Sequence, residues 1–89
     1  MNTETAIFRD FDTLLTRIGF VYYQPSGNHR YYRHEGSDTV IILPEYAPDD
    51  RVSPHHLIGI RRLLDEKDLL AAADFDRALA GSSPDRARA

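Results

Sequence analysis

Residues 29–44 read HRYYRHEGSDTVIILP and predict the β-hairpin that decides the fold. The first six of these residues include two tyrosines, and the run Thr39–Leu43 is rich in β-branched side chains, so both segments favour strands. Between them, Glu35–Asp38 contains the glycine and polar residues that are typical of a tight turn. Pro44 ends the second strand, because proline cannot donate a hydrogen bond to a neighbouring strand.

The segments before this hairpin predict a helix and one further strand. Apolar residues recur at helical spacing between Ile7 and Ile18, which predicts an amphipathic helix over Glu4–Ile18 that ends before Gly19. Phe20–Tyr23 then predicts a strand, and the turn residues Pro25–Asn28 connect it to the hairpin. The three strands therefore form an antiparallel meander.

The segment after the hairpin is predicted to be helical. Ser53 and Pro54 are a helix start, with a hydroxyl cap followed by proline at the first position, and this helix runs to about Glu66 or Lys67. We expect Gly59 to mark a close approach of this helix to the sheet. Residues 69–79 predict a further C-terminal helical segment.

The predicted fold class is therefore α+β, in the order α-β-β-β-α with an extra C-terminal helix. Each of the two main helices needs an apolar partner, and packing both on one face of the three-stranded antiparallel sheet is the simplest solution. This is the architecture of double-stranded-RNA-binding domains. We expect residues 1–80 to form a single domain and residues 81–89 to form a flexible tail.

Composition and charge exclude several classes of function. The chain has 89 residues, no cysteine and a net charge of −3, and ten of its eleven basic residues are arginine. The absence of cysteine excludes disulfides, thiolate zinc sites and a cysteine nucleophile, and is typical of a cytoplasmic protein. The acidic balance argues against strong non-specific binding to nucleic acid. We expect no secretory signal and no membrane association.

The charges are nevertheless segregated along the chain. Residues 13–34 carry three arginines and no acid, whereas residues 35–50 carry five acids and no base. Residues 51–64 are again basic, and residues 65–76 are acidic. The basic segments permit a local RNA contact despite the acidic total.

Among the four histidines, His29 has the setting best suited to chemistry. An imidazole can take a proton from a ribose 2′-hydroxyl, or give one to a leaving oxygen, near neutral pH. Arg30 and Arg33 are candidate phosphate ligands, because guanidinium groups bind phosphate through two parallel hydrogen bonds. Strand alternation places His29, Tyr31 and Arg33 on one face, and Arg30, Tyr32 and His34 on the other. Which arginine contacts phosphate stays open at this point.

Other kinds of site have less support. His55 and His56 are adjacent on a predicted helix, so their side chains diverge, and we expect no metal and no cofactor. The chain has neither a glycine-rich phosphate loop nor a serine-nucleophile motif. His34, His55 and His56 are candidates for a second acid or base.

Several of these motifs occur in an order that resembles the HicA-type mRNA interferase toxins of type II toxin–antitoxin systems. The similarity covers about residues 8–70. The matching features are the run LTRIGF at residues 15–20, the Gly27-Asn28-His29 motif with Tyr32 three residues later, the strand that ends at Pro44, and the helix that begins near Ser53.

The resemblance implies a metal-independent endoribonuclease that cleaves mRNA with His29 as its catalytic residue. It also implies RNA contacts from Gly27, Asn28 and Tyr32, a cytoplasmic location, and a HicB-type antitoxin that covers the active site. Members of the family commonly carry a basic residue and a second histidine after the strand-ending proline, whereas this chain has Glu45 and Tyr46.

This departure leaves two further hypotheses open. The first is a catalytically inactive HicA-like domain that binds RNA by its shape. The second is a protein-interaction domain, in which the acidic segments and the tyrosines at positions 22, 23, 31 and 32 contact a partner protein.

Overall fold

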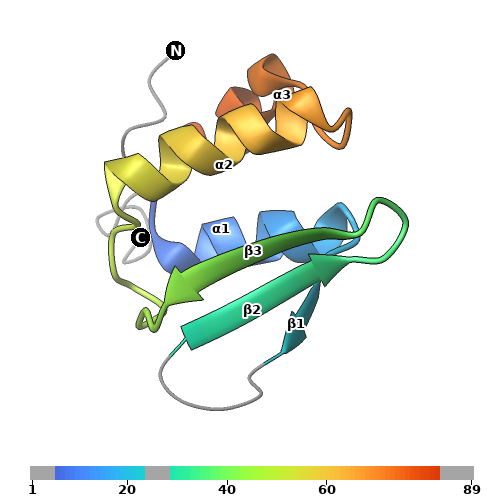
Figure 1. Cartoon of the computed structure of the whole chain (residues 1–89). Coiled ribbons are helices and arrows are strands. Elements are labelled where there is room, and N and C mark those ends of the chain that lie inside the picture. Colours follow the sequence, from blue (N-terminus) through green and yellow to red (C-terminus); the bar gives the residue numbers. More distant parts are fainter. Residues whose placement is uncertain (1–5, 24–28, 83–89) are drawn as a thin grey trace.

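The computed structural model describes residues 6–23 and 29–82 and confirms the predicted α-β-β-β-α order with a further helix (Figure 1). The elements are α1 (Phe8–Arg17), β1 (Val21–Tyr23), β2 (His29–His34), β3 (Thr39–Pro44), α2 (Pro54–Glu66) and α3 (Ala72–Ala78).

The three strands form one antiparallel sheet in the order β1-β2-β3. The register places Tyr31 between Tyr23 and Ile42, and Arg33 between Val21 and Val40. Asp38 has a φ of 58° in the turn that joins β2 to β3, a conformation that aspartate tolerates better than most residues. The predicted hairpin is thus present with the predicted turn.

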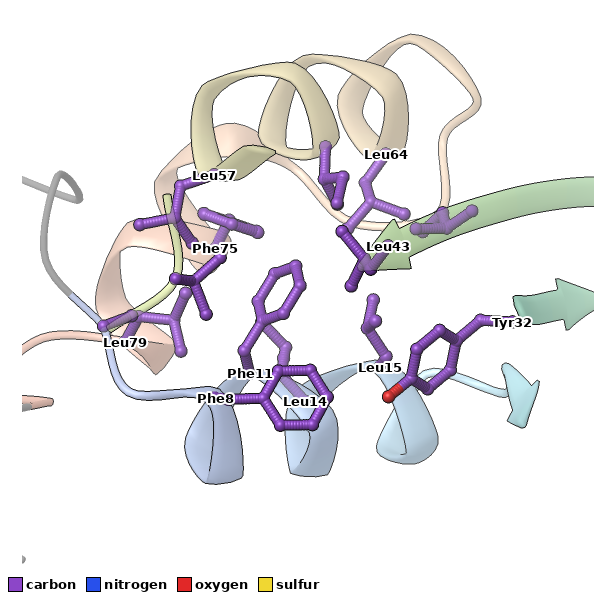
Figure 2. Close-up of a cluster of buried hydrophobic side chains, with 14 of the residues drawn as sticks. Phe8, Phe11, Leu14, Leu15, Tyr32, Leu43, Leu57, Leu64, Phe75 and Leu79 are labelled. Atoms are coloured by element: carbon purple, nitrogen blue, oxygen red, sulfur yellow. The ribbon is translucent and has the colours of Figure 1, made fainter. Parts of the chain in front are cut away.

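The hydrophobic core lies between the helices and one face of the sheet (Figure 2). Side chains alternate along β3, so that Thr39, Ile41 and Leu43 are buried while Val40 and Ile42 are about half exposed. The helices contribute completely buried side chains such as Phe11, Leu15, Leu57, Leu64 and Phe75. Burying one such large apolar side chain stabilises the fold by about 1.5–3 kcal/mol. We call the opposite side of the sheet, which the core does not cover, the open face.

The first helix begins later than the sequence pattern predicts. Ile7 is extended and forms an antiparallel bridge with Arg51, and α1 starts at Phe8. The amide of Val52 also donates to the carbonyl of Ala6, and that of Phe8 donates to the carbonyl of Asp50. Backbone groups that would have formed hydrogen bonds within one more helical turn are therefore hydrogen-bonded to the loop before α2. The remainder of the predicted start, residues 4 and 5, lies outside the described residues.

The C-terminal helical segment is a separate helix that closes the core. Asp68, with a φ of 58°, interrupts the helical backbone after α2, and α3 starts at Ala72. Ser82 is buried, accepts a hydrogen bond from the amide of Ile7 at 3.0 Å and donates one to Asp10 at 2.7 Å. The packed domain therefore extends at least to Ser82, two residues past the predicted boundary. Residues 83–89 of the expected tail lie outside the described residues.

The expected close approach at Gly59 is wrong. Gly59 is exposed, and a Cβ atom placed there would meet no atom of the described residues within 4 Å apart from its own chain neighbours and the nearby backbone of α2. Over the ranges 6–23 and 29–82, no helix has the length and apolar character needed to cross a membrane.

Candidate functional site

His29 is the first residue of β2 and lies opposite Pro44 of β3. Its side chain is exposed, so the ring is open to solvent and is not part of the core. Two members of the predicted histidine motif, Gly27 and Asn28, lie outside the described residues.

The open face beside His29 is aromatic and aliphatic. Alternation along β2 places Tyr31 and Arg33 on the same face as His29, as the sequence predicts. Tyr31 lies next to Tyr23 of β1, which is 41% exposed. Tyr31 therefore lies two positions along β2 from His29, with Tyr23 beside it on β1.

The four tyrosines that the sequence suggests as a single surface are divided between the two faces. The Tyr22 ring lies on the helix side, with its centroid 5.6 Å from that of Tyr32, whereas Tyr23 and Tyr31 occupy the open face. Tyr23 was not among the predicted RNA-binding residues. The register of β1 against β2, together with strand alternation, places Tyr23 beside Tyr31 on the open face.

Arg33 shares the face of His29 but lies at the other end of β2. The two residues are four steps apart along the strand, which corresponds to about 13 Å at about 3.3 Å per residue. The Arg33 guanidinium pairs with Asp38 at 2.8 Å, and this hydrogen bond raises the pKa of Arg33 above its usual value. His29 and Arg33 are therefore too far apart to contact the same phosphate group.

Arg30 lies on the helix side, where its guanidinium group is placed between two aromatic rings. Its central carbon is 4.8 Å from the centroid of Phe8 and 4.7 Å from that of Tyr22, which are favourable cation–π distances. An ion pair with Glu45 at 3.5 Å adds to this arrangement. Arg30 therefore supports the packing of β2 against α1, on the face opposite to His29.

The electrostatic surroundings of Arg30 keep it charged. Burial works to lower the pKa of Arg30, but the neighbouring Tyr32 and Glu45 side chains more than offset this effect, and the pKa lies above its usual value. The Nε atom of Arg30 is buried and has no hydrogen-bond partner among the described residues.

Tyr32 is completely buried in the core. Its hydroxyl donates a hydrogen bond to Asp12 of α1 at 2.6 Å, and Figure 2 shows the ring directed from β2 toward α1. Burial raises the pKa of Tyr32 well above its usual value, and the nearby Asp12 carboxylate raises it further. Complete burial leaves Tyr32 no surface with which to stack on a base. It supports the site by holding β2 to α1.

Two of the remaining histidines are held by local contacts. His34 Nδ1 accepts a hydrogen bond from the amide of Ser37 at 3.2 Å, and its ring centroid lies 5.3 Å from that of Phe20. His56 Nδ1 lies 3.0 Å from the hydroxyl of Tyr46. Both therefore stabilise turns or loops.

Tyr46, at the position after Glu45, has a structural role. Its ring stacks on Phe8 at a centroid distance of 5.3 Å, and its hydroxyl accepts a hydrogen bond from the amide of Ser53 at 2.9 Å. This leaves the hydroxyl proton of Tyr46 available to His56. Tyr46 thus joins α1 to the start of α2, a role that the sequence pattern does not indicate.

His55, the remaining candidate for a second acid or base, is exposed on α2. Within the described part of the chain, no group of three or more histidine, aspartate or glutamate side chains is placed to hold a metal ion. No protein-family model, curated protein or solved structure matches the chain.

Proposed function

We propose that this chain is a metal-independent endoribonuclease of the HicA type, the toxin of a type II toxin–antitoxin pair, with His29 as its general acid and base. The observation that carries the proposal is the exposure of His29 at the start of β2, on the open face of the sheet. An RNA strand can reach an imidazole at this position without displacing a helix. The ring would take the proton of a ribose 2′-hydroxyl, or protonate the leaving oxygen.

The side chains beside His29 suit a single-stranded substrate. Tyr31 and Tyr23 are cross-strand neighbours and offer aromatic surface on which unpaired bases can stack. Arg33, about 13 Å from His29 along the strand, would contact a different phosphate of the same RNA. The substrate would therefore lie along β2, with an unpaired region of an mRNA at His29.

The partner and location of the protein belong to the same proposal. A toxin of this kind acts in the cytoplasm, and a HicB-type antitoxin would restrain it by covering His29. Neither the proposed cleavage of RNA nor the binding of the antitoxin requires a metal or an organic cofactor.

A second candidate function is a HicA-like domain that binds RNA or a partner protein without cleaving it. The apolar side chains of the open face favour this alternative, because Val21, Val40 and Ile42 are 48–53% exposed and do not attract phosphate. The net charge of −3 also reduces affinity for RNA.

Expression in bacterial cells separates the two candidates. We expect the wild-type chain to arrest growth and to degrade mRNA, and we expect His29→Gln, which keeps a polar side chain but cannot titrate near neutral pH, to do neither. Lys67→Gln changes an exposed residue after α2 and serves as the control, with full activity expected. Undiminished growth arrest and mRNA loss in a folded His29→Gln variant would overturn the catalytic proposal.

A further inference from the structure

The outer edge of β3 is an unprotected strand edge. β3 occupies the end of the sheet order, and in the described ranges only β2 pairs with it. Every second residue of such a strand directs its N–H and C=O groups away from its neighbour. All six residues pair with β2 in uninterrupted register, and none of them is charged.

Proteins usually protect an edge strand with a charge, a proline, a bulge, a short length or a covering segment. The other edge strand of this sheet, β1, is only three residues long. β3 is twice that length and has neither a charged side chain nor a bulge, and its proline, Pro44, is its last residue. This difference indicates that β3 is the edge at which a further strand is accommodated.

Both sides of this edge are apolar. On the open face, Val40 and Ile42 are 48% and 53% exposed. The same two side chains also line a groove of about 370 Å³ between β3 and α2. From α2, the groove is lined by His55, His56, Gly59, Ile60 and Leu63. The open space at Gly59 adds room along the groove. A strand paired with β3 would therefore bury side chains on both of its faces.

The two ends of β3 are acidic. Glu35 and Asp38 precede the strand, and Glu45, Asp49 and Asp50 follow it, all five of them exposed. Asp38 and Glu45 pair with arginines of β2, and Asp49 pairs with Arg9 of α1, so none of these partners belongs to β3. A second copy of the chain in antiparallel pairing would place the turn acids of one copy beside the loop acids of the other, which is unfavourable.

We propose that the free edge of β3 binds an extended segment of a partner protein whose central residues are apolar on both faces and whose two ends carry Lys or Arg. Main-chain hydrogen bonds to β3 supply affinity, and the groove beside α2 together with the acidic ends supplies specificity. This inference goes beyond the cleavage proposed for His29. The proposed binding surface is the edge of β3 that does not pair with β2, and binding there does not require catalysis.

The test uses two synthetic peptides and the full chain. The first peptide, Lys-Arg-Val-Ile-Val-Ile-Val-Lys-Arg, has the proposed chemistry, and the second has Glu-Asp in place of both Lys-Arg pairs. Fluorescence anisotropy is expected to show saturable binding of the first peptide and at least tenfold weaker binding of the second. Amide chemical shifts are expected to change along β3 and in the groove-facing half of α2, but not in β1.

A matched pair of variants locates the binding edge. Val40 and Val21 flank Arg33 in the same row of the sheet and are 48% and 50% exposed, but they lie on opposite edge strands. Val40→Lys, which adds a like charge beside the basic end of the peptide, is expected to weaken binding at least tenfold, whereas Val21→Lys changes it less than twofold. Circular dichroism verifies that both variants fold.

Four results would overturn the proposal. Two of them are equal affinity for the two peptides and equal effects of the two valine substitutions on peptide binding. The third is a set of chemical-shift changes centred on β1. The fourth is a dimer of the chain alone, in which the outward-directed amides of β3 are protected from hydrogen exchange without any peptide. None of these results bears on RNA cleavage, so the two proposals fail independently.

Discussion

The hydroxyl of Tyr32 donates a hydrogen bond of 2.6 Å to the carboxylate of Asp12, which joins the middle strand of the sheet to the first helix. Tyr32 is completely buried, so this bond satisfies a polar group that has no access to water. The bond fixes α1 against the strand that begins with His29, and the scaffold of the candidate site therefore depends on a contact inside the core.

Removing this hydroxyl should destabilise the fold. Tyr32→Phe leaves the Asp12 carboxylate without its donor, and hydrogen bonds to charged groups contribute about 1.5–3 kcal/mol. We expect a loss of that size in the free energy of unfolding measured with urea. Tyr23→Phe, on the open face, serves as the control and should change stability by less than about 0.5 kcal/mol. Equal effects of the two substitutions would contradict this assignment.

The raised pKa of Tyr32 predicts a loss of stability at alkaline pH. Above about pH 10 an unfolded tyrosine releases its proton, whereas the folded chain keeps Tyr32 protonated, so the unfolded state binds fewer protons and stability falls as pH rises. The contribution of Tyr32 is fully present below about pH 10. The stability difference between wild type and Tyr32→Phe should therefore shrink by up to about 1.4 kcal/mol per pH unit above that value. A difference that stays constant from pH 9 to pH 11 would refute the prediction.

Two adjacent arginines of α2 should differ strongly in their effect on stability. Arg61 forms two hydrogen bonds with the buried carboxylate of Asp76 in α3, at 2.8 and 3.0 Å, whereas Arg62 pairs with Glu66 in solvent. Arg61→Ala should cost about 1–3 kcal/mol because it leaves a buried carboxylate without its cation. Arg62→Ala should cost less than about 0.5 kcal/mol. Thermal unfolding of both variants checks the order, and a larger loss for Arg62→Ala would reverse it.

The hydroxyl of Ser82 should contribute to stability. This hydroxyl receives the amide proton of Ile7 and donates to Asp10, so Ser82→Ala leaves the buried amide without an acceptor. We expect a loss of about 1–3 kcal/mol. Amide hydrogen exchange at Ile7 should also become faster in this variant. An unchanged exchange rate would show that the hydroxyl is not the acceptor.

Local sequence patterns predicted the elements whose signals are contained within a few residues. The hairpin of residues 29–44 followed from two strand-forming runs and a turn between them, and the start of α2 followed from Ser53 and Pro54. The start of α1 could not be predicted in this way. Ile7 is extended because it bridges Arg51, which lies 44 positions further along the chain, and helical periodicity contains no trace of such a contact.

The candidate site shows the same distinction. Strand alternation correctly separated the face of His29, Tyr31 and Arg33 from the face of Arg30 and Tyr32. It could not indicate which face the helices cover, because that depends on packing between distant segments. The placement of Arg30 between Phe8 and Tyr22 likewise depends on α1 lying against the sheet.

The most direct test of metal-independent catalysis by His29 is cleavage of a labelled single-stranded RNA by the purified chain in the presence of EDTA. The proposed role of His29 predicts that the wild-type chain cleaves this RNA and leaves a DNA of the same sequence intact, because the DNA lacks the 2′-hydroxyl. It also predicts that His29→Gln cleaves the RNA at least about 100-fold more slowly, as expected for the loss of a general acid and base. Cleavage by a folded His29→Gln variant at the wild-type rate would contradict the role of His29 as general acid and base.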